Sequence, residues 1–224
     1  MPRAFVIAIL GAESTGKTTL ATELRDTLAA GGRTVAMVSE HLREWCALRQ
    51  RTPRAEEQAH IAKEQSTLIE AAARSHEVVI ADTTALMIAV YSETVFGDRS
   101  LYPSALLAHR RSDLSLLTAT DLPWRADGLQ RTGAHVREPV DALIRNALHR
   151  AGLPYAVVTG LGPLRLASAL QAVRHALQAP SLEHEAAANP RWRWMCERCG
   201  DPDCERHLLA RPQPPQCGAL VPGA

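Results

Sequence analysis

The first residues of this sequence that could do chemistry form a glycine-rich run ending in a lysine and two threonines. The run consists of Gly11, Ala12, Glu13, Ser14, Thr15, Gly16, Lys17, Thr18 and Thr19. Its first eight residues fit the pattern G-x-x-x-x-G-K-[ST], in which backbone N–H groups surround phosphate oxygens, the lysine reaches the β- and γ-phosphates and the next hydroxyl binds Mg²⁺. The pattern predicts a loop that binds ATP and Mg²⁺, and the structural alternative is a glycine-rich helix cap.

Two carboxylates that follow apolar runs could complete such a site. Asp82 ends one run, where a carboxylate can hold Mg²⁺ through water; the alternative role there is a helix cap. Glu40 ends another run, where it could accept a proton from a substrate hydroxyl or simply begin a helix. Arg43, one helical turn later, could pair with Glu40, reach a phosphate or remain solvated. We take both carboxylates and the lysine of the loop as candidate catalytic residues.

A polar segment at 121–131 combines an aromatic ring with charged side chains. Trp124 could stack on a nucleobase or a nicotinamide ring, and Asp127 could hydrogen-bond a ribose or the backbone of a lid. Arg131, together with Arg137, could close over the transferring phosphoryl group. A tryptophan that covers the end of a sheet is the structural alternative. The segment is therefore a candidate lid, and Arg131 is a candidate catalytic residue.

The elements that must position these residues are short apolar strands alternating with helices. Strands are predicted at 5–10, 34–39, 78–81, 114–118 and 155–159, and helices from 18 onward and at 55–75, 84–95, 139–151 and 164–177. This alternation predicts an α/β fold of the P-loop NTPase type, with a five-stranded parallel sheet and helices on both faces. Ligands of such sheets bind at the carboxyl ends of the strands, where the loop, both carboxylates and the candidate lid would meet.

Composition limits the size and the partners of the protein. Its 224 residues accommodate one P-loop kinase or NTPase domain, assigned to 1–180, and a Pro- and Cys-rich tail at 181–224. Lys and Arg total 25 against 24 Asp and Glu, for a formal net charge of +1, so composition predicts no general attraction to nucleic acid. The sequence has no leader and no apolar run of bilayer length, so we expect a cytoplasmic protein without a membrane partner.

The tail contains a cluster of residue types that bind metals. The cluster consists of Cys196, Cys199, Cys204 and His207. Three thiolates and an imidazole at this spacing could form a tetrahedral structural Zn²⁺ site at 196–207, in which Cys217 or His184 could replace one ligand. The alternative is a disordered proline-rich tail with incidental cysteines.

The order of these motifs resembles the ribosylnicotinamide kinase domain of the NadR type. The resemblance covers residues 4–177 and rests on G-x-E-S-x-G-K-[ST], E-x-x-R-[DE], D-T-[DT] and P-W-x-x-D-G-L. It implies ATP-dependent phosphorylation of the 5′-hydroxyl of nicotinamide riboside, a reaction of NAD biosynthesis with a small-molecule nucleoside as partner. It also implies that Glu40 and Asp82 flank the reacting hydroxyl and Mg²⁺, and that Trp124 and Tyr91 stack on the nicotinamide ring.

The sequence departs from this family at the lid and at its N-terminus. The family has an arginine directly after the lid Gly-Leu, whereas Gln130 stands there and Arg131 follows. No repressor or nucleotidyltransferase module precedes Met1, so we expect neither DNA binding nor adenylyl transfer. Two other functions remain open, a P-loop ATPase or nucleotide switch without a nucleoside acceptor and a binding module that recruits a partner through the tail. A kinase needs a second pocket beside the γ-phosphate, and a switch does not.

Overall fold

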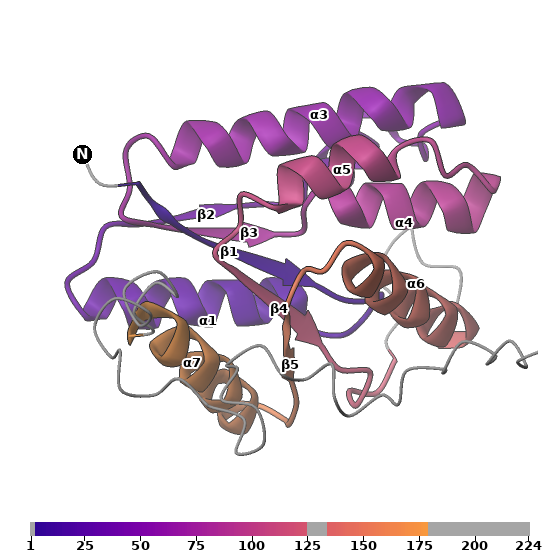
Figure 1. The fold of residues 1–224 in the computed structure, drawn as a ribbon. Helices are drawn as coiled ribbons and strands as arrows, with labels where there is room; N and C mark the ends of the chain where they lie inside the picture. The colour runs from indigo at the N-terminus through magenta and orange to yellow at the C-terminus, as the bar shows by residue number, and fades with distance from the viewer. Residues whose placement is uncertain (1–2, 125–133, 179–224) are drawn as a thin grey trace, which may run out of the picture. The chain divides into compact units, whose positions relative to one another are not determined.

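A five-stranded parallel sheet forms the centre of the computed structural model, which describes residues 3–124 and 134–178 (Figure 1). The strand order is β2-β3-β1-β4-β5. The strands are β1 (Phe5–Leu10), β2 (Val35–Val38), β3 (Val78–Asp82), β4 (Leu114–Thr118) and β5 (Ala156–Val158). The central strands are nearly continuous apolar runs because helices cover both of their faces. The predicted α/β fold with five parallel strands is confirmed.

Helices pack on both faces of the sheet, with α1 and α7 on one face and α3, α4, α5 and α6 on the other (Figure 1). The helices are α1 (Lys17–Ala30), α2 (His41–Arg49), α3 (Ala55–Ala72), α4 (Ala85–Phe96), α5 (Tyr102–His109), α6 (Arg137–Arg150) and α7 (Pro163–Gln178), and a 3-10 turn, η1 (Ala134–Val136), precedes α6. None of these described helices has the length and apolar character needed to cross a bilayer.

The strand predictions were accurate to within one residue at every end. The sequence analysis allowed a helix start at Glu40 but gave no range for α2, and it did not predict α5. α2 has nine residues and α5 has eight, so each offers little more than two turns over which an apolar period could be recognised. α5 also has Pro103 in its first turn, where the missing N–H has no intrahelical partner to lose. α2 matters most for the site because it begins directly after Glu40.

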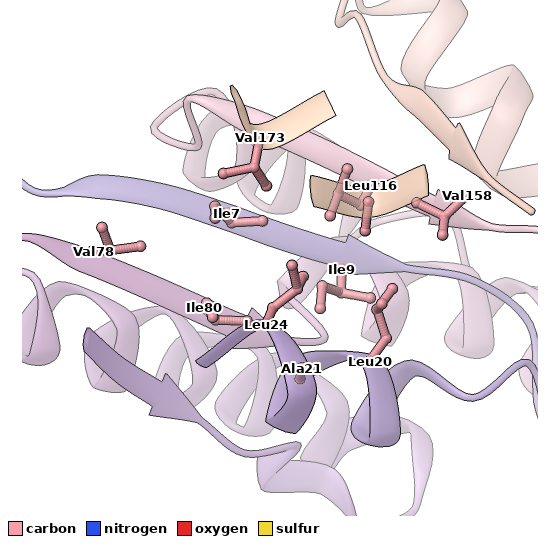
Figure 2. Packing of buried hydrophobic residues seen from close by; sticks show 11 residues of the cluster. Ile7, Ile9, Leu20, Ala21, Leu24, Val78, Ile80, Leu116, Val158 and Val173 are labelled. Atoms are coloured by element: carbon pink, nitrogen blue, oxygen red, sulfur yellow. The ribbon is translucent and has the colours of Figure 1, made fainter. Parts of the chain in front are cut away.

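The core between the sheet and helices α1 and α7 is made of branched aliphatic side chains (Figure 2). Ile7 and Ile9 of β1 belong to this cluster, whereas Val6 and Leu10 pack in clusters on the opposite face. This alternation follows from the two-residue period of a strand. With both faces filled, the central strands cannot shift, and the loops at their carboxyl ends start from fixed positions.

His109 supports one of these loops from within the fold. It ends α5 and is only 3% exposed. Its Nδ1 lies 3.2 Å from Thr84 Oγ1 and its Nε2 lies 2.9 Å from Ser115 Oγ of β4. Burial lowers the pKa of the imidazole from 6.5 to about 4. Because Thr84 follows β3 by two residues, a neutral His109 helps to hold the turn that carries Asp82.

We predict that stability falls on mild acidification because of His109. The unfolded chain takes up a proton near pH 6.5, whereas the folded protein resists protonation until about pH 4. The part of the free energy of unfolding that depends on a neutral His109 is therefore fully present above pH 6.5. It falls by about 1.4 kcal/mol per pH unit as the pH drops from 6.5 toward 4. Urea unfolding of the wild type and of His109→Gln at pH 7 and pH 5 measures it. The variant should lose about 2 kcal/mol less over this interval, and equal losses would contradict the assignment.

Candidate functional site

The phosphate loop joins β1 to α1 and has a backbone that only its glycines allow. Gly11 has φ of 151° and a Cβ there would overlap Thr118 Oγ1, while Gly16 has φ of 75° at the N-cap of α1. Thr118 Oγ1 also lies 2.7 Å from Thr15 Oγ1, which donates to Ala12 O at 2.8 Å. Thr118, at the end of β4, therefore supports the loop from behind, a role that nothing in its sequence context indicated.

The first two residues of α1 carry the charged and hydroxyl groups of the loop. Lys17 Nζ donates to the carbonyl oxygens of Gly11 and Ala12, both at 2.9 Å, so the ammonium is held against the loop. Thr18 Oγ1 donates to Asp82 Oδ2 at 2.6 Å. Since Gly16 has no side chain to cap α1, the first N–H groups of this helix receive no side-chain cap. These N–H groups and the positive end of the helix suit an anionic phosphate.

Thr18 and Asp82 also fit a Mg²⁺ site. Asp82 is 2% exposed, and its Oδ1 has no hydrogen-bond partner among the described residues. In the parallel pairing of β1 with β3, Ile9 lies beside Asp82, so the carboxylate ends up next to the phosphate loop. A hydroxyl and a carboxylate are the hard oxygen ligands that Mg²⁺ prefers. The alternative role of Asp82 as a helix cap is wrong, because Thr84 Oγ1 caps α4 by accepting from Leu86 N at 3.3 Å.

Glu40 lies in the turn between β2 and α2, at the same edge of the sheet. Its side chain is 12% exposed, and its Oε2 lies 3.5 Å from Arg43 Nη2. Glu40 is the N-cap residue of α2, but its carboxylate makes no cap hydrogen bond. The structure thus brings together the predicted ion pair and the predicted helix start. The strand order β2-β3-β1 places Glu40, Asp82 and Gly11 after three neighbouring strands.

Gln65 of α3 ties two of these strand ends together. It is completely buried, and its Oε1 accepts from His41 N at 2.7 Å. Its Nε2 donates to Ser39 O at 3.2 Å and to Thr83 O at 3.4 Å. Ser39 and His41 are the residues on either side of Glu40, and Thr83 directly follows Asp82. The sequence analysis did not identify Gln65, although a glutamine on the apolar face of a predicted helix is a signal for such a role.

Arg165 of α7 holds a second set of loops in place. Its guanidinium is buried and donates to Thr15 O, Ala119 O and Gly160 O and to Asp121 Oδ1, at 2.7 to 3.0 Å. Burial alone would raise the pKa of the Asp121 carboxyl, but hydrogen bonds from Arg165 and from Gly160 N hold it below its usual range. Arg165 therefore connects the phosphate loop to the start of the candidate lid, which sequence reasoning did not foresee.

A cavity of about 460 Å³ opens beside the phosphate loop and brings several of the predicted residues together, but Thr18 and Asp82 are not among the residues that line it. It is lined by Glu13, Ser14, Lys17, Glu40, Leu42, Arg43, Cys46, Thr52, Pro53, Gln58, Tyr91, Thr94, Val95, Phe96, Val136 and Val140. The loop lysine, the Glu40 carboxylate, Arg43 and the Tyr91 ring thus share one space. The cavity is large enough for a small organic molecule placed next to the γ-phosphate position.

Other predicted residues lie at the margin of the structure or outside it. Trp124 is the last described residue before the gap and is not among the described residues that line the cavity. Asp127 and Arg131 fall outside the described residues, as does the proposed Zn²⁺ cluster, which consists of Cys196, Cys199, Cys204 and His207. Within the described residues no group of three or more His, Cys, Asp or Glu side chains could hold a metal ion. The lid contacts and the zinc site stay predictions.

Comparisons with known proteins support the fold. Residues 6–163 match a protein family described as an AAA domain. A NadR protein in complex with NR superposes with a TM-score of 0.65 and 20% identity, over 79% of this chain and 52% of NadR. A NadR protein in complex with NAD and AMP-PNP gives 0.63 and 19%, over 79% and 50%. Deoxyadenosine kinase from M. mycoides gives 0.53 and 15%, over 76% and 99%.

At these identities the likeness shows a shared fold and no more. The chain spans about half the length of the NadR chains that it matches. No curated protein sequence matches it. The predicted P-loop fold is thereby confirmed, and the chemistry must be argued from the site itself.

We predict that Gln65→Leu weakens both the fold and nucleotide binding. The substitution leaves the backbone groups of Ser39, His41 and Thr83 buried without their partner. Each unpartnered group should lower the free energy of unfolding by at most about 1–3 kcal/mol. Thermal and urea unfolding, with and without Mg²⁺ and a non-hydrolysable ATP analogue, measure both effects. Gln65→Glu keeps the acceptor for His41 N but sets a buried carboxylate oxygen against Ser39 O and Thr83 O, so it should be destabilised as well. A Gln65→Leu protein as stable as the wild type would contradict this role.

Proposed function

The chain belongs to the AAA domain family that matches residues 6–163, and from its site we propose that it transfers the γ-phosphoryl group of ATP to a hydroxyl of a small nucleoside-like acceptor. The observation that carries the proposal is the cavity of about 460 Å³ in which Lys17 of the phosphate loop and the carboxylate of Glu40 face one space. A nucleotide switch needs no second pocket at this position, so the cavity favours a kinase over a switch.

The acceptor that we propose is nicotinamide riboside, phosphorylated on its 5′-hydroxyl. Three observations support it. The ordered motifs of the sequence resemble a ribosylnicotinamide kinase domain, the fold is shared with a NadR protein solved with NR, and Tyr91 and Phe96 supply aromatic rings to the cavity. The fold shared with deoxyadenosine kinase makes another nucleoside the natural second candidate.

In the proposed reaction each residue has a definite role. The loop N–H groups and Lys17 bind the β- and γ-phosphates and neutralise the charge that builds on them. Glu40 accepts the proton of the acceptor hydroxyl while the oxygen of that hydroxyl bonds to the γ-phosphorus and ADP leaves. The products are a phosphomonoester, ADP and a proton. Arg43, 3.5 Å from Glu40, orients this carboxylate. Thr18 and, through water, Asp82 would hold Mg²⁺, which would supply positive charge to the phosphates of the bound nucleotide.

We predict that the wild type converts nicotinamide riboside to its mononucleotide in the presence of ATP and Mg²⁺, and that Glu40→Gln lowers kcat by roughly 10²-fold or more. A removed general base typically accounts for a loss of about this size. Coupled ADP release and chromatography of the mononucleotide, across a panel of nucleosides, measure the reaction. Glu44→Gln, on the exposed side of the same helix, is the matched control and should remain active. ATP hydrolysis indifferent to every nucleoside would overturn the kinase.

The predicted ring stacking of Trp124 has its own test. Trp124→Ala should raise KM for the nucleoside by about fivefold while KM for ATP changes little, because aromatic stacking contributes about 1 kcal/mol. Trp124→Phe keeps a ring and should restore most of the affinity. Equal changes in both KM values would assign Trp124 to the fold of the lid rather than to the acceptor.

A further inference from the structure

The buried face of α3 carries two glutamines that the fold treats differently. Gln58 and Gln65 lie two helical turns apart, and both are buried, with Gln58 only 4% exposed. Gln65 makes hydrogen bonds at both ends of its amide. Gln58 Oε1, in contrast, is buried and has no hydrogen-bond partner within residues 3–124 and 134–178. The same residue type on the same face is therefore satisfied at one position and orphaned at the other.

An orphaned buried amide is unfavourable. Such a group gives up its hydrogen bonds to water on folding and gains none in return. The neighbouring buried positions of α3, Ile61 and Ala62, are apolar and belong to a hydrophobic cluster with Leu42 and Cys46 of α2. In the ligand-free protein, an aliphatic side chain at position 58 would pack against these apolar neighbours more favourably than Gln58 does. A partner that arrives with a ligand removes the cost, which makes the orphaned amide a pointer to binding.

Gln58 is placed where a bound molecule can reach it. It lines the same cavity as Lys17 and Glu40. Lys17 lies after β1, whereas Gln58 lies on α3. Helix α3 packs beside α2 and β2, and β2 is two strands away from β1 in the order β2-β3-β1. Tyr91 and Phe96 of α4 contribute the aromatic wall of this cavity. An acceptor whose hydroxyl meets Lys17 and Glu40 would therefore carry its ring between these aromatic side chains and Gln58.

We propose that Gln58 determines acceptor specificity by hydrogen bonding to an amide-type edge on the ring, one in which a carbonyl oxygen stands beside an N–H. The proposal rests on the proposed function and names its substrate class. A side-chain amide offers one acceptor and two donors, so it pairs with a carboxamide in two parallel hydrogen bonds. A ring that carries a carboxylate in place of the carboxamide presents only acceptors, and Gln58 Oε1 then faces a negative oxygen. The site should accordingly discriminate against acidic rings.

The test combines binding with stability. Binding of nicotinamide riboside and of nicotinic acid riboside, in the presence of Mg²⁺ and AMP-PNP, is measured by calorimetry for the wild type, Gln58→Leu and Gln58→Glu. Gln58→Leu should bind nicotinamide riboside about tenfold more weakly, as expected for the loss of one to two hydrogen bonds, and should lose its preference over the acidic riboside. Gln58→Glu keeps the shape but removes the donor to the ring carbonyl, so it should also bind weakly.

Thermal unfolding of the ligand-free protein separates recognition from a structural role. Gln58→Leu should unfold at the same temperature as the wild type or higher, because the orphaned amide is gone, whereas a structural glutamine would leave a destabilised protein. Gln171→Leu makes the same chemical change at an exposed position of α7 outside the cavity. This control should change neither binding nor stability.

Failure of this inference can be told apart from failure of the kinase. If Gln58→Leu binds nicotinamide riboside as tightly as the wild type while the mononucleotide still forms, specificity by Gln58 is overturned and the kinase stands. If binding depends on Gln58 but no phosphoryl transfer occurs, the recognition stands and the kinase is overturned. If the wild type binds no amide-bearing riboside, both the inference on Gln58 and nicotinamide riboside as the acceptor are overturned, while the nucleoside panel still decides whether the protein is a kinase.

Discussion

The parallel pairing of β1 with β3 is the constraint on which the rest of the site depends. It sets Ile9 beside Asp82, so that β3 delivers its carboxylate to the loop that follows β1. The hydrogen bond from Thr18 to Asp82, at 2.6 Å, then joins the first turn of α1 to the end of β3. A slip of one residue would turn the side chains of β3 to the opposite face and remove the carboxylate from the phosphate loop. The filled cores on both faces of the sheet prevent such a slip, and Figure 2 shows the core on the face of α1 and α7.

Buried polar side chains hold the loops at the ends of these strands in fixed positions. Gln65 joins the turn around Glu40 to the turn after Asp82, and Arg165 joins the phosphate loop to the base of the candidate lid. His109 and Thr118 support the β3 and β1 loops from within. Each of these groups is hydrogen-bonded, and in a dry interior such bonds hold loops firmly because an unmade bond is expensive. The edge of the sheet that carries the candidate site is thus held in place by buried polar side chains outside the proposed reacting groups.

Two of the buried side-chain atoms without a hydrogen-bond partner among the described residues lie where ligands are proposed to bind. They are Asp82 Oδ1 and Gln58 Oε1. The first suits a metal-bound water and the second suits the edge of a ring, at two places where a phosphoryl donor and its acceptor would approach each other. A protein that binds two molecules side by side is expected to leave such atoms for them, because a partner supplied by the protein would compete with the ligand.

The sequence by itself determined the phosphate loop, the five parallel strands and the candidate roles of Glu40 and Asp82, because each depends on local residue types and on a period that a short segment displays. It also pointed to two cavity residues, to Arg43 through its spacing from Glu40 and to Tyr91 through resemblance. Only the tertiary structure decided that Thr84 and not Asp82 caps α4, that Gln65 and Arg165 hold the loops, and that Gln58 Oε1 has no hydrogen-bond partner in the part of the chain that the structure describes. Arg165 meets Thr15 across 150 positions of chain. Such contacts, and the absence of one, arise from packing between distant segments, which no local pattern encodes.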